Sequence, residues 1–304
     1  MSRPDWSREG PTWPNRESSR FVRTRATRWH VQVKGEGPDL LLLHGTGAST
    51  HSWAPIVPHL SEQFRLVIVD LPAHGFTLPL QGGTMKLERV VEALDQLLDA
   101  LGCSPRCIIG HSAGAAIACR MLLQTRREGA IIALNGALSP LSRHAPAIPA
   151  ALLRPFMVNP LLPRILSAHA SDRTVGGILD STGSRIPESQ RALYRRLFRY
   201  SGHLEGALAM MADWQLADVR RDLAEMPGRL HLLAAEGDRF IPASLSRSLA
   251  REIEGAHFVS LGRLGHLAHE ESPAKIAQVI RSIVHPSAGE TSGAEKDVQD
   301  SAPI

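Results

Sequence analysis

The sequence is poor in cysteine and in aromatic residues, and it contains no long apolar run. Its 304 residues include only three cysteines, Cys103, Cys107 and Cys119. Their number is odd, and neither C-x-x-C nor a Cys/His ligand spacing occurs, which argues against a disulfide framework and against a metal site. Reduced thiols predict a cytoplasmic protein. No apolar stretch approaches the roughly 20 residues that a membrane-spanning helix needs.

Charge is also modest, with a formal net charge of +4 at pH 7 and scattered arginines. No basic-aromatic motif is present, so the sequence does not predict nucleic-acid binding. One arginine cluster falls on a possible helix, and a solvated helix face is its simplest interpretation: Arg191, Arg195, Arg196 and Arg199. Residues 1–19 lack the apolar segment of a signal peptide and are expected to form an irregular arm. Residues 286–304 are expected to be a disordered tail.

Short apolar runs alternate with helical patterns along most of the chain. Residues 20–28 and 29–34 predict two antiparallel strands, and buried strands are expected near 40–43, 65–70, 106–109, 130–134, 230–235 and 257–261. This alternation predicts βαβ units and a mostly parallel sheet. It breaks between residues 139 and 213, where prolines recur among apolar pieces. That segment is too apolar to remain solvated and is expected to be a helical insertion.

Residues 110–114 read G-H-S-A-G and lie between a predicted strand and a predicted helix. In that context the pattern predicts a nucleophile elbow, in which a sharp turn holds Ser112 in a strained conformation with its hydroxyl exposed. Glycine is expected two residues to either side because larger side chains would collide. The pattern alone leaves open a small-residue turn with a solvated serine.

Three further loops follow predicted strands, where parallel α/β sheets bind ligands. The loop H-G-T-G at 44–47 predicts an oxyanion hole made by the backbone N–H groups of Thr46 and Ala113. Asp238 is the expected acid, with Glu236 as the alternative. His266 is the expected base; the other candidate is His269, which would begin to turn away with the following helix.

The chain order Ser112, Asp238, His266 is the nucleophile–acid–base order of α/β hydrolases. From about residue 20 to 285 the sequence resembles that superfamily. The resemblance implies an α/β-hydrolase fold with a mostly parallel eight-stranded sheet flanked by helices. Residues 20–138 and 214–285 would form the core, and residues 139–213 a helical cap inserted after strand six.

Within the superfamily, the sequence resembles the magnesium-chelatase accessory hydrolases of bacteriochlorophyll synthesis, the BchO type. The motifs that carry this resemblance include LLLHGTGASTHSW at 41–53, DLPAHGFT at 70–77, NPLLP at 159–163, MMADW at 210–214 and LGHLAHEE at 264–271. They extend into the cap, where superfamily members normally diverge. Ala73 and Ala235 depart from the family pattern, which usually has glycine at both positions.

The resemblance implies a serine hydrolase accessory to magnesium insertion or a nearby step, with no cofactor. It also implies association with magnesium chelatase and a cytoplasmic location, peripheral to photosynthetic membranes. The substrate would be an ester or a porphyrin-like small molecule, held by cap side chains that we expect to be Phe156, Met157, Met211 and Trp214. Two alternatives stay open at this point: a tetrapyrrole binding or delivery protein on a hydrolase scaffold, and a perhydrolase.

Overall fold

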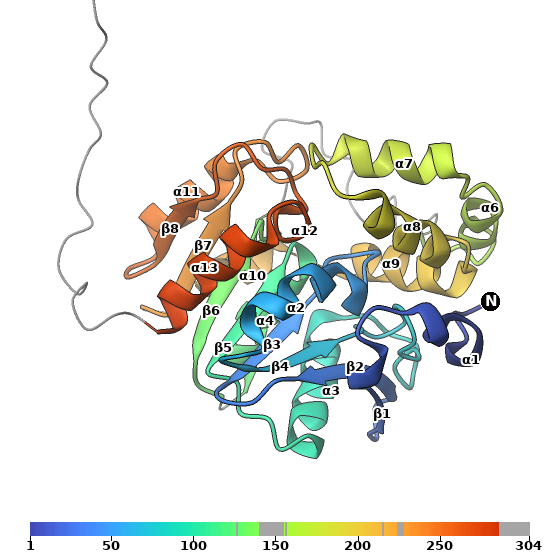
Figure 1. The fold of residues 1–304 in the computed structure, drawn as a ribbon, viewed down its shortest axis with the longest axis horizontal. Coiled ribbons are helices and arrows are strands. Elements are labelled where there is room, and N and C mark those ends of the chain that lie inside the picture. Colours follow the sequence, from blue (N-terminus) through green and yellow to red (C-terminus); the bar gives the residue numbers. More distant parts are fainter. Residues whose placement is uncertain (126, 140–154, 156, 215, 224–227, 286–304) are drawn as a thin grey trace, which may run out of the picture.

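The computed structural model describes residues 1–125, 127–139, 155, 157–214, 216–223 and 228–285. Its centre is an eight-stranded sheet in the order β1-β2-β4-β3-β5-β6-β7-β8 (Figure 1). β2 pairs antiparallel with both β1 and β4, and all other neighbours are parallel. The strands are β1 (Ser19–Arg23), β2 (Arg28–Lys34), β3 (Asp39–Leu43), β4 (Arg65–Val69), β5 (Cys107–His111), β6 (Ala130–Leu134), β7 (Leu230–Ala234) and β8 (His257–Ser260).

The central strands β3 and β5 are buried on both faces, as their continuous apolar sequences predict. In their register Leu43 lies opposite Gly110, and Gly110 lies opposite Ala133 of β6. The carboxyl ends of β3, β5 and β6 therefore meet at one edge of the sheet. This alignment brings the loops that carry the predicted site residues together.

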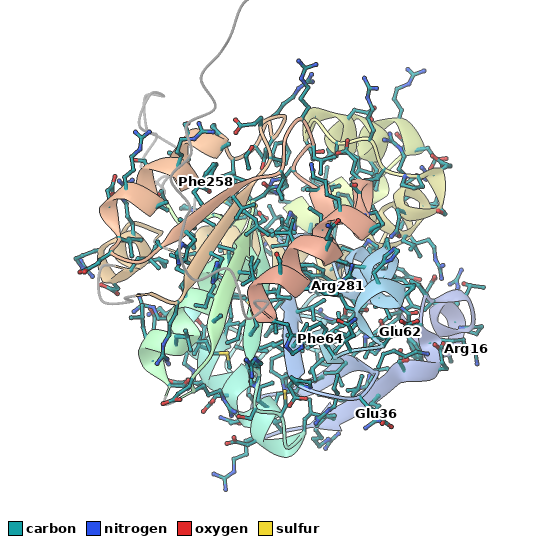
Figure 2. All side chains as sticks on the ribbon, turned by 60° about the vertical axis from the view of Figure 1, so that its left-hand side comes forward. Arg16, Glu36, Glu62, Phe64, Phe258 and Arg281 are labelled. Carbon is teal, nitrogen blue, oxygen red and sulfur yellow. The ribbon has the colours of Figure 1, made fainter. Side chains whose placement is uncertain are left out.

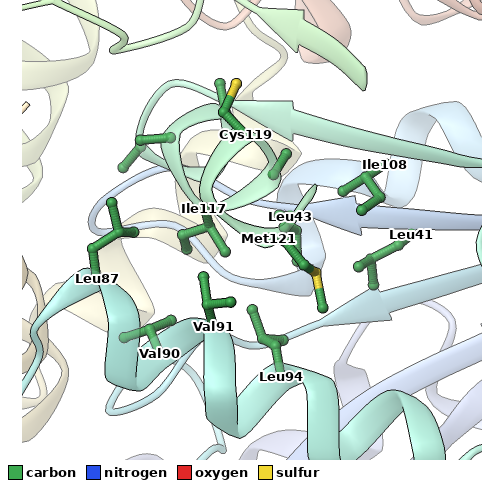
Figure 3. Packing of buried hydrophobic residues seen from close by; sticks show 14 of the residues in the cluster. Leu41, Leu43, Leu87, Val90, Val91, Leu94, Ile108, Ile117, Cys119 and Met121 are labelled. Atoms are coloured by element: carbon green, nitrogen blue, oxygen red, sulfur yellow. The ribbon is translucent and has the colours of Figure 1, made fainter. Parts of the chain in front are cut away.

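Two helical layers cover the sheet. On one face lie α3 (Leu87–Ala100), α4 (Ala113–Gln124), α10 (Leu216–Asp222) and α11 (Ala243–Glu252). Figure 3 shows Val91 and Leu94 of α3 near Ile117 and Met121 of α4, with Leu43 of the sheet behind them. The apolar positions of α3 recur at helical spacing, so the helix buries one stripe and exposes the other.

The opposite face is covered by η3 (a 3₁₀ helix, Thr50–Ile56), α2 (Val57–Leu60), α12 (Ala268–Glu271) and α13 (Pro273–Val284). Arg281 of α13 donates to the carbonyl of His59 at 2.7 Å. The Phe64 ring stacks on His285 just beyond the end of α13, with centroids 5.0 Å apart. Figure 2 shows Arg281 and Phe64 beside this helix.

Between β6 and β7, four of the helices in the described part of the chain lie over one end of the sheet (Figure 1). They are α6 (Leu162–Ala168), α7 (Asp172–Ser181), α8 (Glu188–Phe198) and α9 (Ser201–Asp213). His203 of α9 bridges two strand-end loops: its Nδ1 accepts from Gly75 N and its Nε2 donates to Gly47 O. The inserted helices are thereby attached to the loops that form the site.

Ala73, one of the two departures from the family pattern, has φ +61°. That left-handed conformation costs a residue with a Cβ about 1–2 kcal/mol, which explains why glycine is usual there. Gly206 of α9 packs directly against this residue, and a Cβ at Gly206 would lie 2.6 Å from Ala73 O. The close approach of α9 to the core therefore depends on glycine at 206.

The arm at residues 1–19 differs from the expected irregular segment, because it forms α1 (Trp6–Glu9) and two 3₁₀ turns, η1 (Gly10–Thr12) and η2 (Arg16–Ser18). The Asp5 side chain caps α1 by accepting from Ser7 N. Trp6 and Trp13 both contact the Phe76 ring edge-on. These contacts order the arm against the core. The predicted tail at 286–304 lies outside the described residues.

Candidate active site

Ser112 lies in the turn between β5 and α4, with φ +51° and ψ −115°. Such a conformation is sparsely populated for a residue with a Cβ and persists only where the surrounding structure enforces it. Here Ser112 N donates to Leu134 O, and Ser112 O accepts from Ala115 N and Ala137 N. The backbone of the turn is thus fixed on both sides, as a nucleophile elbow requires.

The flanking glycines are sterically required. A Cβ at Gly110 would lie 2.3 Å from Gly114 O, and one at Gly114 would lie 2.3 Å from Leu43 O. Both obstacles are backbone atoms of the close-packed α4 and β3, which cannot move aside. The two glycines therefore let the helix start directly against the sheet, which presents Ser112 to the pocket.

His266 and Asp238 form a buried hydrogen bond, with Nδ1 of the histidine 2.7 Å from Oδ2 of the carboxylate. The other carboxylate oxygen, Oδ1, accepts from Phe240 N and Ile241 N at 2.7 and 2.9 Å. Because Asp238 accepts from Nδ1, this nitrogen carries the proton and Nε2 is left as the basic site. His266 and Ser112 line the same pocket. Within the described residues no hydrogen bond joins them, which is common before substrate binds.

The two alternatives from the sequence lie elsewhere. Glu236 is exposed and pairs with Arg247 at 2.7 Å, so it faces away from His266. His269 is buried against Trp53, with ring centroids 4.4 Å apart, and neither of its ring nitrogens has a hydrogen-bond partner among the described residues. The geometry favours Asp238 and His266.

Thr46 and Ala113 also line this pocket beside Ser112. Ala113 is the first residue of α4, so its N–H has no partner within the helix. Neither its N–H nor that of Thr46 donates to another group in the described part of the chain. His44 fixes the Thr46 loop, because its Nδ1 donates to Gly45 O and its Nε2 accepts from Leu71 N. Two unpaired donors next to a serine suit a developing oxyanion.

The pocket has a volume of about 620 Å³ and is mostly apolar. The inserted helices supply much of its wall: Ile178, Leu179, Tyr194, Phe198, Met210, Met211 and, just after α9, Trp214. Trp214 is fixed by donating from Nε1 to Met85 O at 2.7 Å. A large apolar body can therefore be enclosed beside Ser112.

Of the four expected cap contacts, Met211 and Trp214 line the pocket. Met157, which precedes α6, is not among the described residues that line the pocket. Phe156 lies outside the described residues. Sequence analysis missed Tyr194 and Phe198. Their spacing of four on one helix was the signal that could have indicated a shared face.

A second group of buried titratable side chains lies behind His266. Tyr194 of α8 donates to Glu270 Oε1 at 2.6 Å, and the other carboxyl oxygen has no hydrogen-bond partner among the described residues. Burial raises the pKa of Glu270 from 4.5 to about 8. The hydrogen bond joins an inserted helix to the loop that carries His266.

This carboxyl predicts a pH-dependent stability. The unfolded chain releases the Glu270 proton near pH 4.5, whereas the folded chain holds it to about pH 8. The contribution of protonated Glu270 to the free energy of unfolding is therefore complete below pH 4.5. It falls by about 1.4 kcal/mol per pH unit as the pH rises to 8. Glu270→Gln keeps an acceptor for Tyr194 and should flatten this slope in urea unfolding at pH 7.0, 7.5 and 8.0. The exposed Glu254→Gln is the control, and equal slopes in both variants would refute the assignment.

The family is shown by comparison with known proteins. The family model described as "Alpha/beta hydrolase family" matches residues 40–279. The chain therefore belongs to the α/β hydrolase family. It is 35% identical over 263 residues to the magnesium-chelatase 30 kDa subunit of Rhodobacter capsulatus, a match covering 85% of this chain and 91% of that protein. This agrees with the resemblance to the BchO type.

Other similar proteins are more distant. A pimeloyl-[acyl-carrier protein] methyl ester esterase of Nitrosospira multiformis is 28% identical and covers 83% of this chain and 97% of its own. Among solved structures, a lipase-like protein of Acinetobacter baumannii superposes with a TM-score of 0.72 at 20% identity, over 88% and 90% of the two chains. The superposition supports the α/β-hydrolase fold. In the described part of the chain no helix is long and apolar enough to cross a bilayer.

Proposed function

We propose that this protein is a serine hydrolase of the BchO type that cleaves an ester, accessory to magnesium insertion or a nearby step of bacteriochlorophyll synthesis. The observation that carries the chemistry is the buried His266–Asp238 hydrogen bond, which faces the same pocket as the strained Ser112. The proposed pathway rests on the similarity to the magnesium-chelatase 30 kDa subunit.

The proposed reaction is acyl transfer through Ser112. His266 Nε2 takes the Ser112 proton as the oxygen attacks the ester carbonyl, and Asp238 stabilises the imidazolium that forms. The N–H groups of Thr46 and Ala113 hold the oxyanion. His266 then protonates the leaving alcohol, and water activated by the same histidine releases the acyl group from Ser112.

The first test is hydrolysis of p-nitrophenyl pentanoate by the purified protein, together with labelling by a fluorophosphonate. We expect turnover, and we expect mass spectrometry to place the label on Ser112. Turnover without a label on Ser112 would overturn the mechanism. Expression of Ser112→Ala in a phototroph that lacks the related protein then asks whether the chemistry is needed for pigment synthesis.

A second candidate function is tetrapyrrole binding and delivery, in association with magnesium chelatase. It is favoured by the apolar pocket of about 620 Å³ next to Ser112 and by the name of the Rhodobacter capsulatus relative described above. Absorbance titration with protoporphyrin tests it. Delivery would be supported over hydrolysis by two results together: the native protein has no esterase activity, and Ser112→Ala still binds protoporphyrin saturably.

The pocket also predicts the charge of the substrate. Arg239 is exposed at the wall, and its guanidinium has no hydrogen bond or ion pair within the described residues. Arg239→Met should raise KM for the p-nitrophenyl monoester of glutaric acid by about two- to fivefold, a typical effect of one exposed charge pair. The neutral p-nitrophenyl pentanoate has the same acyl length and should keep its KM. An equal change for both esters would contradict recognition of a carboxylate.

A further inference from the structure

We propose that Asn135 is a positioning residue that fixes the acid and base loops of the triad relative to each other. The inference rests on the proposed hydrolase mechanism and adds a residue that the sequence motifs did not assign to it. Asn135 is buried and directly follows β6, between the strand of the nucleophile and the strand of the acid. Its φ is +45°, a left-handed conformation that asparagine tolerates better than most residues.

The Asn135 side chain makes three hydrogen bonds across the ends of three strands. Its Nδ2 donates to Gly265 O at 3.1 Å and to His266 O at 2.8 Å. Its Oδ1 accepts from Ala235 N at 2.8 Å. The reverse orientation of the amide would set an oxygen against two carbonyl oxygens, so the hydrogen-bond pattern fixes the assignment.

The carbonyl oxygen of His266 accepts a second hydrogen bond. His111 Nε2 lies 2.9 Å from this oxygen, and since a carbonyl can only accept, Nε2 carries the proton. Burial lowers the pKa of His111 well below its usual value, so the ring is neutral. His111 precedes Ser112. The backbone of the base is thus attached both to the nucleophile strand and to Asn135.

The Asn135 side chain is also connected, through Ala235, to the turn that carries Asp238. Ala235 N donates to Asn135, and Ala235 O accepts from Asp238 N at 3.2 Å, so the start of the acid turn is held at both ends. Ala235 is the second position where relatives usually have glycine. A displacement of about 1 Å between reacting groups can cost a factor of 100 in rate, so losing this shared attachment should affect turnover more than binding.

The first variant is Asn135→Gly, which tolerates the positive φ and removes all three side-chain hydrogen bonds. We expect kcat for p-nitrophenyl pentanoate to fall by about 10- to 100-fold while KM stays within about threefold. A residue that only stabilised the fold would lower the melting temperature and leave kcat unchanged.

The second variant is Asn135→Asp, which keeps the oxygen that faces Ala235 and replaces the Nδ2 donor. When ionised, the introduced carboxylate faces two carbonyl oxygens; when protonated, its hydroxyl can donate to one of them. The ratio of variant to native kcat should therefore fall as the pH rises. Gln32→Glu is the matched control, because Gln32 is likewise a buried amide on a distant strand, where its Nε2 donates to oxygens of Pro14, Asn15 and Ser19.

A readout independent of turnover is the low-field proton resonance of His266 Nδ1–H in the full-length protein. We expect Asn135→Gly and ionised Asn135→Asp to shift or broaden it, and Gln32→Glu to lower the melting temperature without moving it. An unchanged resonance and kcat in the Asn135 variants would overturn the proposal. If the native protein hydrolyses no ester, the proposed function fails, and the resonance still decides the role of Asn135. If Asn135→Gly does not fold, the pH series of Asn135→Asp decides.

Discussion

Replacing Ser112 with alanine should lower kcat for p-nitrophenyl pentanoate by about 10³- to 10⁶-fold, with KM within threefold. The expected size follows from the triad acting as a unit, since loss of the nucleophile removes the covalent route and leaves only binding and the oxyanion donors. Initial rates of purified protein, corrected for spontaneous hydrolysis, provide the measurement.

Two comparisons make this test specific. Ser246 is a buried serine on α11, remote from the pocket lining, so Ser246→Ala should keep native kcat. His266→Ala should lose about as much activity as Ser112→Ala, and the double variant should lose little more. Retention of more than a tenth of native kcat by Ser112→Ala would exclude Ser112 as the nucleophile.

Acid should destabilise the protein progressively as the pH falls from about 6.5 toward 4. Burial is the main cause that lowers the pKa of six buried histidines: His44, His51, His74, His111, His203 and His269. For five of them the pKa falls from 6.5 to about 3 or 4. These groups are neutral in the folded chain at pH values where the unfolded chain already binds protons.

Because the histidine pKa values are lower in the folded chain than in the unfolded chain, the free energy of unfolding falls as the pH falls. The contribution of these histidines is complete above pH 6.5 and is lost as the pH falls toward 4, by up to about 1.4 kcal/mol per pH unit for each group. Because several such groups act together, the loss can approach the free energy of unfolding of about 5–15 kcal/mol that a domain typically has. Circular dichroism between pH 7.5 and 4 measures the midpoint of acid unfolding.

His269 is the buried histidine that we choose to replace, because its ring nitrogens make no hydrogen bond within the described residues. It packs against Trp53 and His111, with its Nε2 3.9 Å from Glu270 Oε1. His269→Leu should move the midpoint of acid unfolding to lower pH, while the exposed His59→Gln should leave it unchanged. Stability that stays constant from pH 7 to 5 would contradict this account. The variant should also retain esterase activity, which would separate His269 from His266.

The sequence by itself determined the strands, the turn at Ser112 and the chain order of the site residues. These features depend on local constraints: continuous apolar runs fit strands that are buried on both faces, and only glycine fits at 110 and 114 where backbones nearly touch. The motifs also indicated the BchO type, and the match to the magnesium-chelatase 30 kDa subunit agrees with it.

Contacts between distant parts of the chain were decided only by the tertiary structure. The composition of residues 1–19 suggested irregular structure, yet Trp6 and Trp13 find Phe76 far along the chain and order the arm. The cap contacts depended on which helix faces the serine, so Tyr194 was missed, and Met157 is not among the described lining residues. The sequence predicted no role for Asn135, because its partners at 235, 265 and 266 become neighbours only when β6, β7 and the loop after β8 align.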